Sequence, residues 1–210
     1  MSPRRADPQV RVALFEAAAR LLAEEGPTAL TMRRLATDVG ASTTAVYTHF
    51  GSKEEVVRAV VAEGFDRLDL RLRELRPSGD PVTDLANMGW AYRRNALANP
   101  HLYAAMFGRT MFAYDPHPTD RATGLHTLAH LVDGVAVAAK SGRMAIDDAW
   151  PVASQLWMML HGVVSLEING FFETDLFDGI DSIRRLFRDV TVGHGDDPAA
   201  AEASIAASTP

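Results

Sequence analysis

Apolar residues recur at steps of three and four along most of the chain, which is the spacing of an amphipathic helix. The first run starts after Asp7-Pro8, a favourable helix start, and ends at Gly26-Pro27. The later runs are bounded by prolines, as helices usually are, and no strand-like alternation stands out. These runs predict helices near residues 53–76, 81–98, 101–112, 119–141, 147–171 and 179–192. The expected fold class is therefore all-α.

Between the first run and residue 53, the pattern predicts two short helices joined by a tight turn. Thr31 can cap the first helix, and Gly40 supplies the left-handed conformation that ends it. Ser42 or Thr43 can cap the second helix, which runs to Phe50. The residues predicted to pack the two helices together are Ala36, Val39, Val46 and Phe50. With the first long helix, this pair would complete a three-helix head.

The outer face of the second short helix is polar and rich in hydroxyl groups. Its members are Thr43, Thr44, Tyr47, Thr48 and His49. Such a face suits hydrogen bonds to phosphates and base edges in a DNA major groove.

The order T-x-R-x-L-A…G-x-S-x-x-x-V-Y-x-H-F-x-S-K-E, from Thr31 to Glu54, resembles the DNA-binding domain of the TetR family of bacterial transcriptional repressors. The resemblance implies a helix-turn-helix domain over residues 1–53. It also implies that Thr43 and Thr44 meet base edges, helped by Thr48 and Arg33. The expected phosphate contacts are Thr31, Tyr47, His49 and Lys53. Phosphate contacts position such a head, whereas base contacts specify the site.

Two stretches of the remaining chain, residues 99–108 and 156–167, are similar to the C-terminal domain of one TetR subfamily. That subfamily is named for a Trp-His-Gly motif, here Trp157, His161 and Gly162. The resemblance implies that residues 77–193 bind a small-molecule effector and dimerise through helices 147–171 and 179–192. The residues expected at the dimer interface are Leu156, Leu160, Val164, Ile180, Ile183, Leu186 and Phe187. The residues expected to line the effector pocket are Trp90, Arg93, Tyr103, Met106, Phe107, Met111, His130, Trp157 and His161.

A two-fold dimer would read two half-sites about one helical turn apart, so we expect a pseudo-palindromic double-stranded DNA operator. The helix over 53–76 would connect the head to the body. An effector that displaces this helix would change the separation of the heads and lift repression. One alternative is a dimeric DNA-binding regulator that has no effector.

A second alternative is a metal-dependent enzyme that uses His126 and His130. These histidines share one helical face, and Asp133 lies a turn beyond, which is half of a metal site. Thr127 stands where the glutamate base of a zinc protease would be. No Ser-His-Asp set or phosphate-binding loop is apparent. We therefore expect no enzyme activity, no metal and no cofactor.

Charge changes this interpretation only slightly. The formal net charge is −6, but residues 1–53 hold seven Lys and Arg against five Asp and Glu, so the expected DNA-binding end is positive. The chain contains no cysteine, no apolar run of the ~20 residues that span a bilayer, and no secretory signal. These features favour a cytoplasmic protein without membrane partners. The Ala-, Ser- and Asp-rich residues 194–210 are expected to be disordered.

Overall fold

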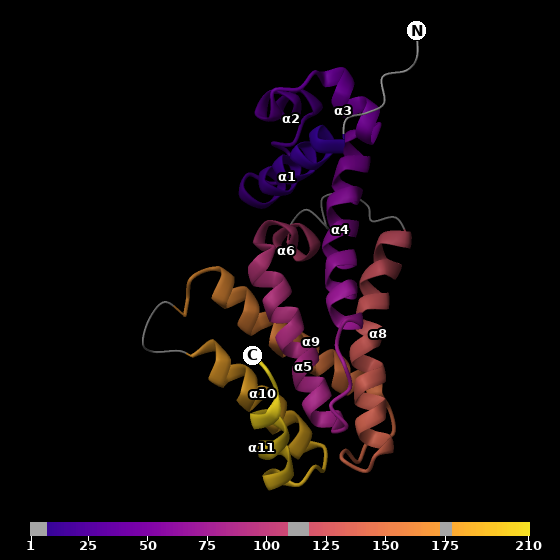
Figure 1. The fold of residues 1–210 in the computed structure, drawn as a ribbon, viewed down its shortest axis with the longest axis vertical. Helices are drawn as coiled ribbons and strands as arrows, with labels where there is room; N and C mark the ends of the chain where they lie inside the picture. The colour runs from indigo at the N-terminus through magenta and orange to yellow at the C-terminus, as the bar shows by residue number, and fades with distance from the viewer. Residues whose placement is uncertain (1–7, 109–117, 173–177) are drawn as a thin grey trace. The chain divides into compact units, whose positions relative to one another are not determined.

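The computed structural model describes residues 8–108, 118–172 and 178–210 (Figure 1). These residues form helices and no strands, which confirms the all-α prediction. The helices are α1 (Pro8–Glu24), α2 (Met32–Val39), α3 (Thr43–Phe50), α4 (Lys53–Arg73), α5 (Pro81–Ala98), α6 (Pro100–Phe107), α8 (Pro118–Lys140), α9 (Ala149–Ile168), α10 (Gly179–Gly193) and α11 (Pro198–Ala207).

The chain divides into two compact units, and α4 contributes residues to both. The first unit comprises residues 1–67 and 99–123, and the second comprises residues 68–98 and 124–210. The helix α6 therefore belongs to the first unit, although the sequence predicts a body that begins at residue 77. It ends at Phe107, earlier than the predicted 101–112, and residues 109–112 lie outside the described part of the chain.

In the first unit, α1 packs against α2 and α6, and α2 packs against α3. The buried apolar side chains of the three-helix head include Leu14, Ala18, Leu21, Leu35, Val46 and Phe50. Val56 and Val60 continue this core along α4. A Cβ atom at Gly64 would lie 2.5 Å from Sδ of Met106, so a side chain at this position would displace Met106 of α6.

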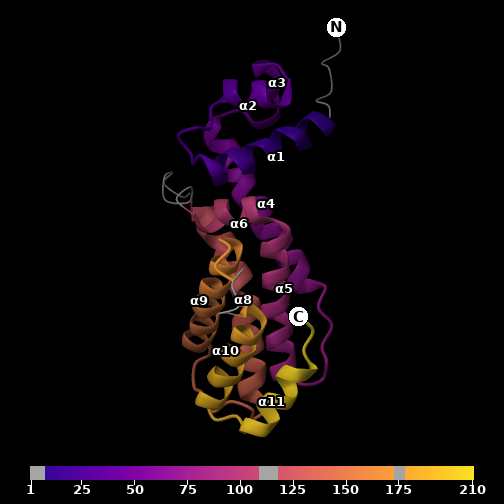
Figure 2. The ribbon, with the colours of Figure 1, turned by 90° about the vertical axis from the view of Figure 1, so that its left-hand side faces the viewer.

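In the second unit, α5 packs against α9, α10 and α11. Figures 1 and 2 show α9 and α10 side by side, with α11 next to α10. Gly89 of α5 has no room for a side chain because the ring of Phe187 on α10 occupies that position. The core of this unit is thus built by the inner faces of helices that are far apart in sequence.

The prediction of disorder for residues 194–210 is wrong, because the segment forms α11. The Asp197 side chain caps this helix by accepting N–H groups of Ala199 and Ala200 at 3.0 and 2.9 Å. Ala201 and Ile205 are buried. Small side chains suffice here because α11 lies directly against α5 and α10.

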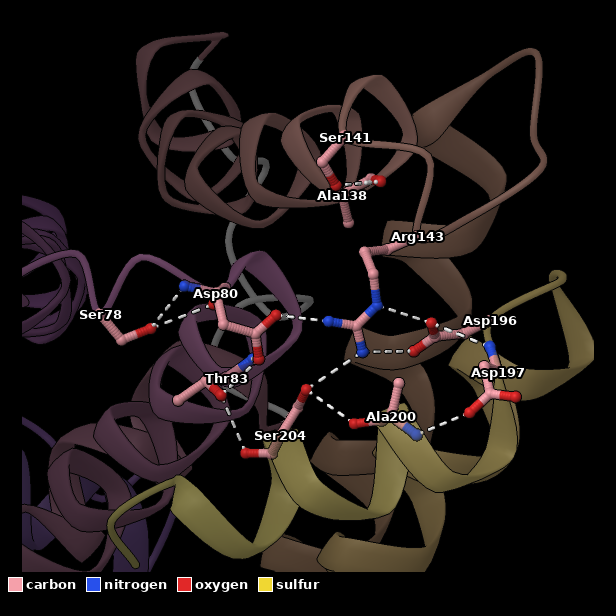
Figure 3. A network of polar contacts seen from close by, with 10 residues as sticks. All are labelled: Ser78, Asp80, Thr83, Ala138, Ser141, Arg143, Asp196, Asp197, Ala200 and Ser204. Atoms are coloured by element: carbon pink, nitrogen blue, oxygen red, sulfur yellow. Dashed lines mark hydrogen bonds and ion pairs between the residues drawn. The ribbon is translucent and has the colours of Figure 1, made fainter.

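One arginine joins three segments of the second unit (Figure 3). The guanidinium of Arg143 donates to both carboxylate oxygens of Asp196, at 2.6 and 2.8 Å, and also to Asp80. It further donates to Ser204 Oγ of α11 at 3.0 Å. Burial alone would raise the pKa of Asp80, but hydrogen bonds from Ser204 and Thr83 and the nearby Arg143 charge lower it overall. The cluster holds α11 in place, and the positive charge of the arginine is balanced by the carboxylates that it contacts.

Candidate functional site

Local hydrogen bonds fix the ends of the two helices in the helix-turn-helix segment. The Thr31 side chain accepts the N–H of Arg34 at 3.0 Å and so caps α2. Gly40 ends α2 with φ of 69°, a left-handed conformation that favours glycine. The Ser42 side chain accepts the N–H of Ala45 at 3.1 Å and begins α3. These caps fix where each helix starts and hence which side chains of α3 face outward.

The outer face of α3, defined here as Thr43, Thr44, Tyr47, Thr48 and His49, is accessible. The first four side chains are exposed and His49 is half-buried. The Tyr47 ring is 54% exposed, which is high for a large aromatic residue. The opposite side of α3 is anchored in the core by its two buried residues. The structure thus presents all five residues of this face as one polar surface.

Hydrogen bonds within the protein limit what two hydroxyl groups of this region can offer to a DNA partner. Thr48 Oγ1 donates to the carbonyl of Thr44 at 2.8 Å, so its proton is already used inside the helix. Thr48 therefore offers a partner a methyl group and acceptor lone pairs. The hydroxyl of Thr31 accepts from the backbone of Arg34 and keeps its own proton for an anionic oxygen.

Arg33 and Arg34 are neighbours in sequence but differ in what they contact. Nε and Nη2 of Arg34 donate to Asp38 and Glu25, each at 3.0 Å, and the hydrogen bond to Asp38 is the main cause of its raised pKa. Arg33 is exposed, and within the described ranges no carboxylate pairs with it. Arg33 is therefore the available cation of α2, as the predicted DNA contact requires.

Lys53 is the first residue of α4 and is half-buried. The preceding Ser52 caps α4 by accepting the N–H of Glu55 at 3.2 Å. Hydrogen bonds from its own backbone and from Ser52 lower the pKa of Glu54. The predicted phosphate contact thus lies at a well-defined helix start that follows α3 directly.

The residues predicted to line an effector pocket are divided between the two units. Tyr103, Met106 and Phe107 belong to α6 in the first unit, whereas Trp90, Arg93, His130, Trp157 and His161 belong to the second. Met111 lies outside the described residues. The members in the first unit serve as packing: the Phe107 ring meets those of Phe65 and Tyr103 at centroid distances of 5.8 and 5.1 Å.

Within the second unit, Trp157 and His161 do come together with polar residues of α5. Tyr92 Oη lies 3.0 Å from Nδ1 of His161, whose ring centroid is 5.7 Å from that of Trp157. Partial burial lowers the pKa of His161. Both oxygens of Glu167 accept from the guanidinium of Arg93 in a partly buried pair. We call Tyr92, Arg93, Trp157, His161 and Glu167 the α5–α9 polar cluster.

Two predicted pocket residues have other partners. The indole N–H of Trp90 donates to Ser208 Oγ at 2.8 Å, so Trp90 anchors the end of α11. Nε2 of His130 lies 2.7 Å from Asp69 Oδ1 on α4. Sequence reasoning gave no role to Asp69 or Glu167, because their partners lie 61 and 74 residues away and no local pattern links them.

The residues predicted for a dimer interface require a correction. Six of the seven are buried in the core of the protomer itself, namely Leu156, Leu160, Val164, Ile183, Leu186 and Phe187. Ile180 is half-buried. They are unavailable to a partner because the contact of α9 and α10 with α5 already covers them. The exposed large apolar side chains on α9 are instead Trp150, Met158, Met159 and Leu166.

Comparison with known sequences decides the family. Residues 14–60 match the bacterial regulatory proteins of the tetR family. Residues 85–190 match the tetracyclin repressor-like C-terminal domain, which covers half of the 210 residues and includes the Trp157, His161 and Gly162 motif. The chain belongs to the TetR family. It is a DNA-binding transcriptional regulator and not an enzyme.

Individual relatives of this TetR regulator are consistent with that family assignment. An uncharacterized HTH-type transcriptional regulator of Mycobacterium tuberculosis is 29% identical over 181 residues, covering 84% of this chain and 79% of the relative. A protein of unknown function from Rhodococcus sp. RHA1 shares the fold with a TM-score of 0.76 at 24% identity, covering 93% and 100% of the two chains. The TetR family regulator PfmR from Thermus thermophilus has a TM-score of 0.70 at 21% identity, covering 85% and 97%.

Among the described residues, no helix combines the length and the apolar character needed to cross a bilayer.

Proposed function

We propose that this TetR regulator is a homodimeric repressor that binds a pseudo-palindromic operator and leaves it when a small-molecule effector binds. The observation that carries the DNA side of the proposal is the accessible outer face of α3 beside the available guanidinium of Arg33. In this proposal Thr43, Thr44 and Arg33 meet base edges, while Thr31, Tyr47, His49 and Lys53 hold phosphates. Because it acts on chromosomal DNA, the regulator would work in the cytoplasm.

The dimer would form through the outer face of α9. Its exposed positions, Gln155, Met158, Met159, Gly162 and Leu166, recur at steps of three and four and so share one face. Met158 and Met159 are 58% and 41% exposed. A Cβ atom at Gly162 would meet nothing within 4 Å, so a partner helix has room to approach there. An exposed apolar stripe of this kind is typical of a protein interface.

The effector would bind at the α5–α9 polar cluster, which combines a partly buried ion pair with Tyr92, Trp157 and a half-buried imidazole. A ligand could exchange hydrogen bonds with these groups without leaving a charge unpaired. RolR, which shares the fold with a TM-score of 0.57 at 16% identity, has been solved with the phenolic ligand resorcinol. A small hydroxylated aromatic molecule is the effector class that we would screen first.

Release from DNA would depend on α4, which begins at Lys53 and contributes residues to both units. The effector lowers DNA affinity only if it binds more tightly to the conformation that does not fit the operator. The coupling is thus expected to be reciprocal: operator DNA should weaken effector binding by the same factor.

Fluorescence anisotropy on DNA from upstream of the protein's own gene tests the DNA side. We expect binding about 10³-fold or more tighter than to scrambled DNA, with a strong salt dependence. Lys53→Ala should lower affinity for every sequence about fivefold per half-site at 0.15 M salt and reduce the salt slope by about one per half-site. Lys140→Ala, an exposed lysine on α8, is the matched control. If the upstream DNA shows no preference, selection from genomic fragments follows, and absence of any preferred fragment would overturn the proposal.

A further inference from the structure

Three potential metal ligands meet between α4 and α8 in the second unit, where Figure 1 shows the two helices side by side. Asp69 of α4 offers a carboxylate, and His126 and His130 of α8 offer imidazoles. One ligand atom from each residue lies within 4.8 Å of the others. Asp69 Oδ1 is 2.7 Å from Nε2 of His130 and 3.9 Å from Nε2 of His126.

We propose that Asp69, His126 and His130 form a binding site for one divalent transition-metal ion. The two histidines are four residues apart, which places both imidazoles on one face of α8, the arrangement used by helical zinc sites. The sequence shows only this pair of histidines and not the third ligand. The structure adds the third ligand from a helix 61 residues away from His130.

The burial of the three side chains suits a site that is formed in advance but open. Asp69 and His130 are only 18% and 27% exposed and are held together by their hydrogen bond. His126 is 63% exposed, so an ion can enter from the solvent and this imidazole can rotate to meet it. Three protein ligands leave at least one coordination position for water or another small molecule.

The required movement is small. With bonds of about 2.1 Å, ligand atoms around a tetrahedral or octahedral ion lie about 3.0–3.4 Å apart. The distances of 2.7 and 3.9 Å from Asp69 Oδ1 bracket this range. Metal binding therefore needs two adjustments: the exposed His126 imidazole must approach Asp69 by about 0.5 Å or more, and Asp69 Oδ1 and His130 Nε2 must separate by about 0.3 Å or more as the ion replaces the proton between them.

The donor set indicates which ions fit. Two imidazole nitrogens with one carboxylate suit Zn²⁺, Co²⁺ and Ni²⁺, whereas Mg²⁺ and Ca²⁺ prefer oxygen ligands alone. Because the chain belongs to a family of regulators, the ion would not serve catalysis. It would join the second half of α4 to α8.

A competing cation is already present. Nη2 of Arg73 lies 2.9 Å from Asp69 Oδ2 and 3.3 Å from Nε2 of His126. Its side chain is 59% exposed at the last residue of α4, so it can turn into the solvent when an ion binds. Giving up an exposed pair of this kind should weaken metal binding about two- to fivefold. Removal of Arg73 should therefore tighten it by the same factor.

Isothermal titration calorimetry on the full-length chain, without an affinity tag and after dialysis against a chelator, tests the site. We expect one Zn²⁺, Co²⁺ or Ni²⁺ per chain, no displacement by excess Mg²⁺, and a melting temperature raised by about 5–10 °C at a hundredfold excess over Kd.

Substitution of any one ligand should weaken metal binding about 100-fold or more, beyond the loss seen when only a supporting residue is removed. The three variants are Asp69→Asn, His126→Ala and His130→Ala. The exposed His101→Ala is the matched histidine control.

Arg73→Ala should tighten binding about two- to fivefold. Arg71→Ala, which removes an exposed arginine of α4 paired with Glu74 just after the helix, should leave metal binding unchanged. His126 is exposed, so its substitution tests the site without disturbing the fold. A wild-type Kd weaker than about 0.1 mM, or binding that survives His126→Ala, would overturn the proposal. Neither readout involves DNA, so the outcome is independent of the proposed operator binding.

Discussion

The helices α3 and α9 both have one face buried in their own unit, yet their exposed faces have opposite chemistry. On α3, Val46 and Phe50 face the core and the outer face carries hydroxyl groups, a phenol and an imidazole. On α9, Leu156 and Leu160 face the core, while the outer face carries Met158, Met159 and Leu166. The difference fits the two kinds of partner that we propose: a polar, charged polymer at α3 and an apolar protein surface at α9.

This comparison also shows what burial adds to periodicity. An apolar position at helical spacing can belong either to the core of the protomer or to an interface between subunits. On α9 both kinds occur on one helix, and only the exposure of each side chain separates them.

The largest effect is expected on the buried face of α9. Leu156 is fully buried, so Leu156→Ala should lower the free energy of unfolding by about 2–5 kcal/mol through lost apolar contact and a residual cavity. Met158→Ala, which removes a more exposed side chain of the same helix, should lower the stability of the protomer by less than about 0.5 kcal/mol. Urea denaturation at several protein concentrations separates the stability of the folded protomer from the free energy of dimer formation. Equal losses for both variants would contradict the assignment of the two faces.

The exposed face of α9 should control assembly. The double substitution Met158→Glu and Met159→Glu would bury two carboxylates in the proposed interface and should raise the dimer dissociation constant about 100-fold or more. Val137→Glu changes a side chain of α8 that is 57% exposed and should leave assembly unchanged. Sedimentation velocity measures the dissociation constant, and circular dichroism verifies the fold. A dimer that withstands the double substitution would place the interface elsewhere.

On the head, the contrast between neighbouring arginines should appear in operator preference. Arg33→Ala should reduce the preference for the correct operator by about 1–3 kcal/mol for each base that it reads, with a smaller change on scrambled DNA. Arg34→Ala should leave the preference unchanged, because that guanidinium is held by Glu25 and Asp38. Competition anisotropy with operators mutated one base pair at a time measures the preference. If Arg34→Ala reduced the operator preference as much as Arg33→Ala, the ion pairs of Arg34 would not keep its guanidinium from reading bases.

The sequence predicts α2 and α3 well because their determinants are local. Thr31, Gly40 and Ser42 act within four residues of the groups that they cap, and the side chains of Val46 and Phe50 point to the same side of one helix. The fold class and the accessible face of α3 follow from such short-range chemistry.

What the sequence could not predict depends on contacts between distant residues. The i,i+4 spacing of Arg34 and Asp38 is visible in the sequence, but the second ion pair of Arg34, with Glu25, depends on how the chain packs after α1. The tail lacks apolar bulk, but α11 is stabilised by Ser204 and Ser208 through partners more than 60 residues away. The metal-ligand cluster likewise depends on Asp69, which only tertiary packing brings to α8.

The smallest effect is a dependence of stability on pH that arises at the edge of the buried face of α9. Burial lowers the pKa of His161 below its ordinary value of 6.5, so the unfolded chain binds more protons than the folded chain in mildly acidic solution. The free energy of unfolding should therefore fall as the pH drops below about 6.5, with a contribution from this residue of at most about 1.4 kcal/mol per pH unit. In His161→Gln this contribution is absent, so the curve between pH 7 and 5 should be flatter than that of the wild type. Parallel curves would mean that the imbalance in proton binding comes from other groups and that burial does not keep His161 neutral.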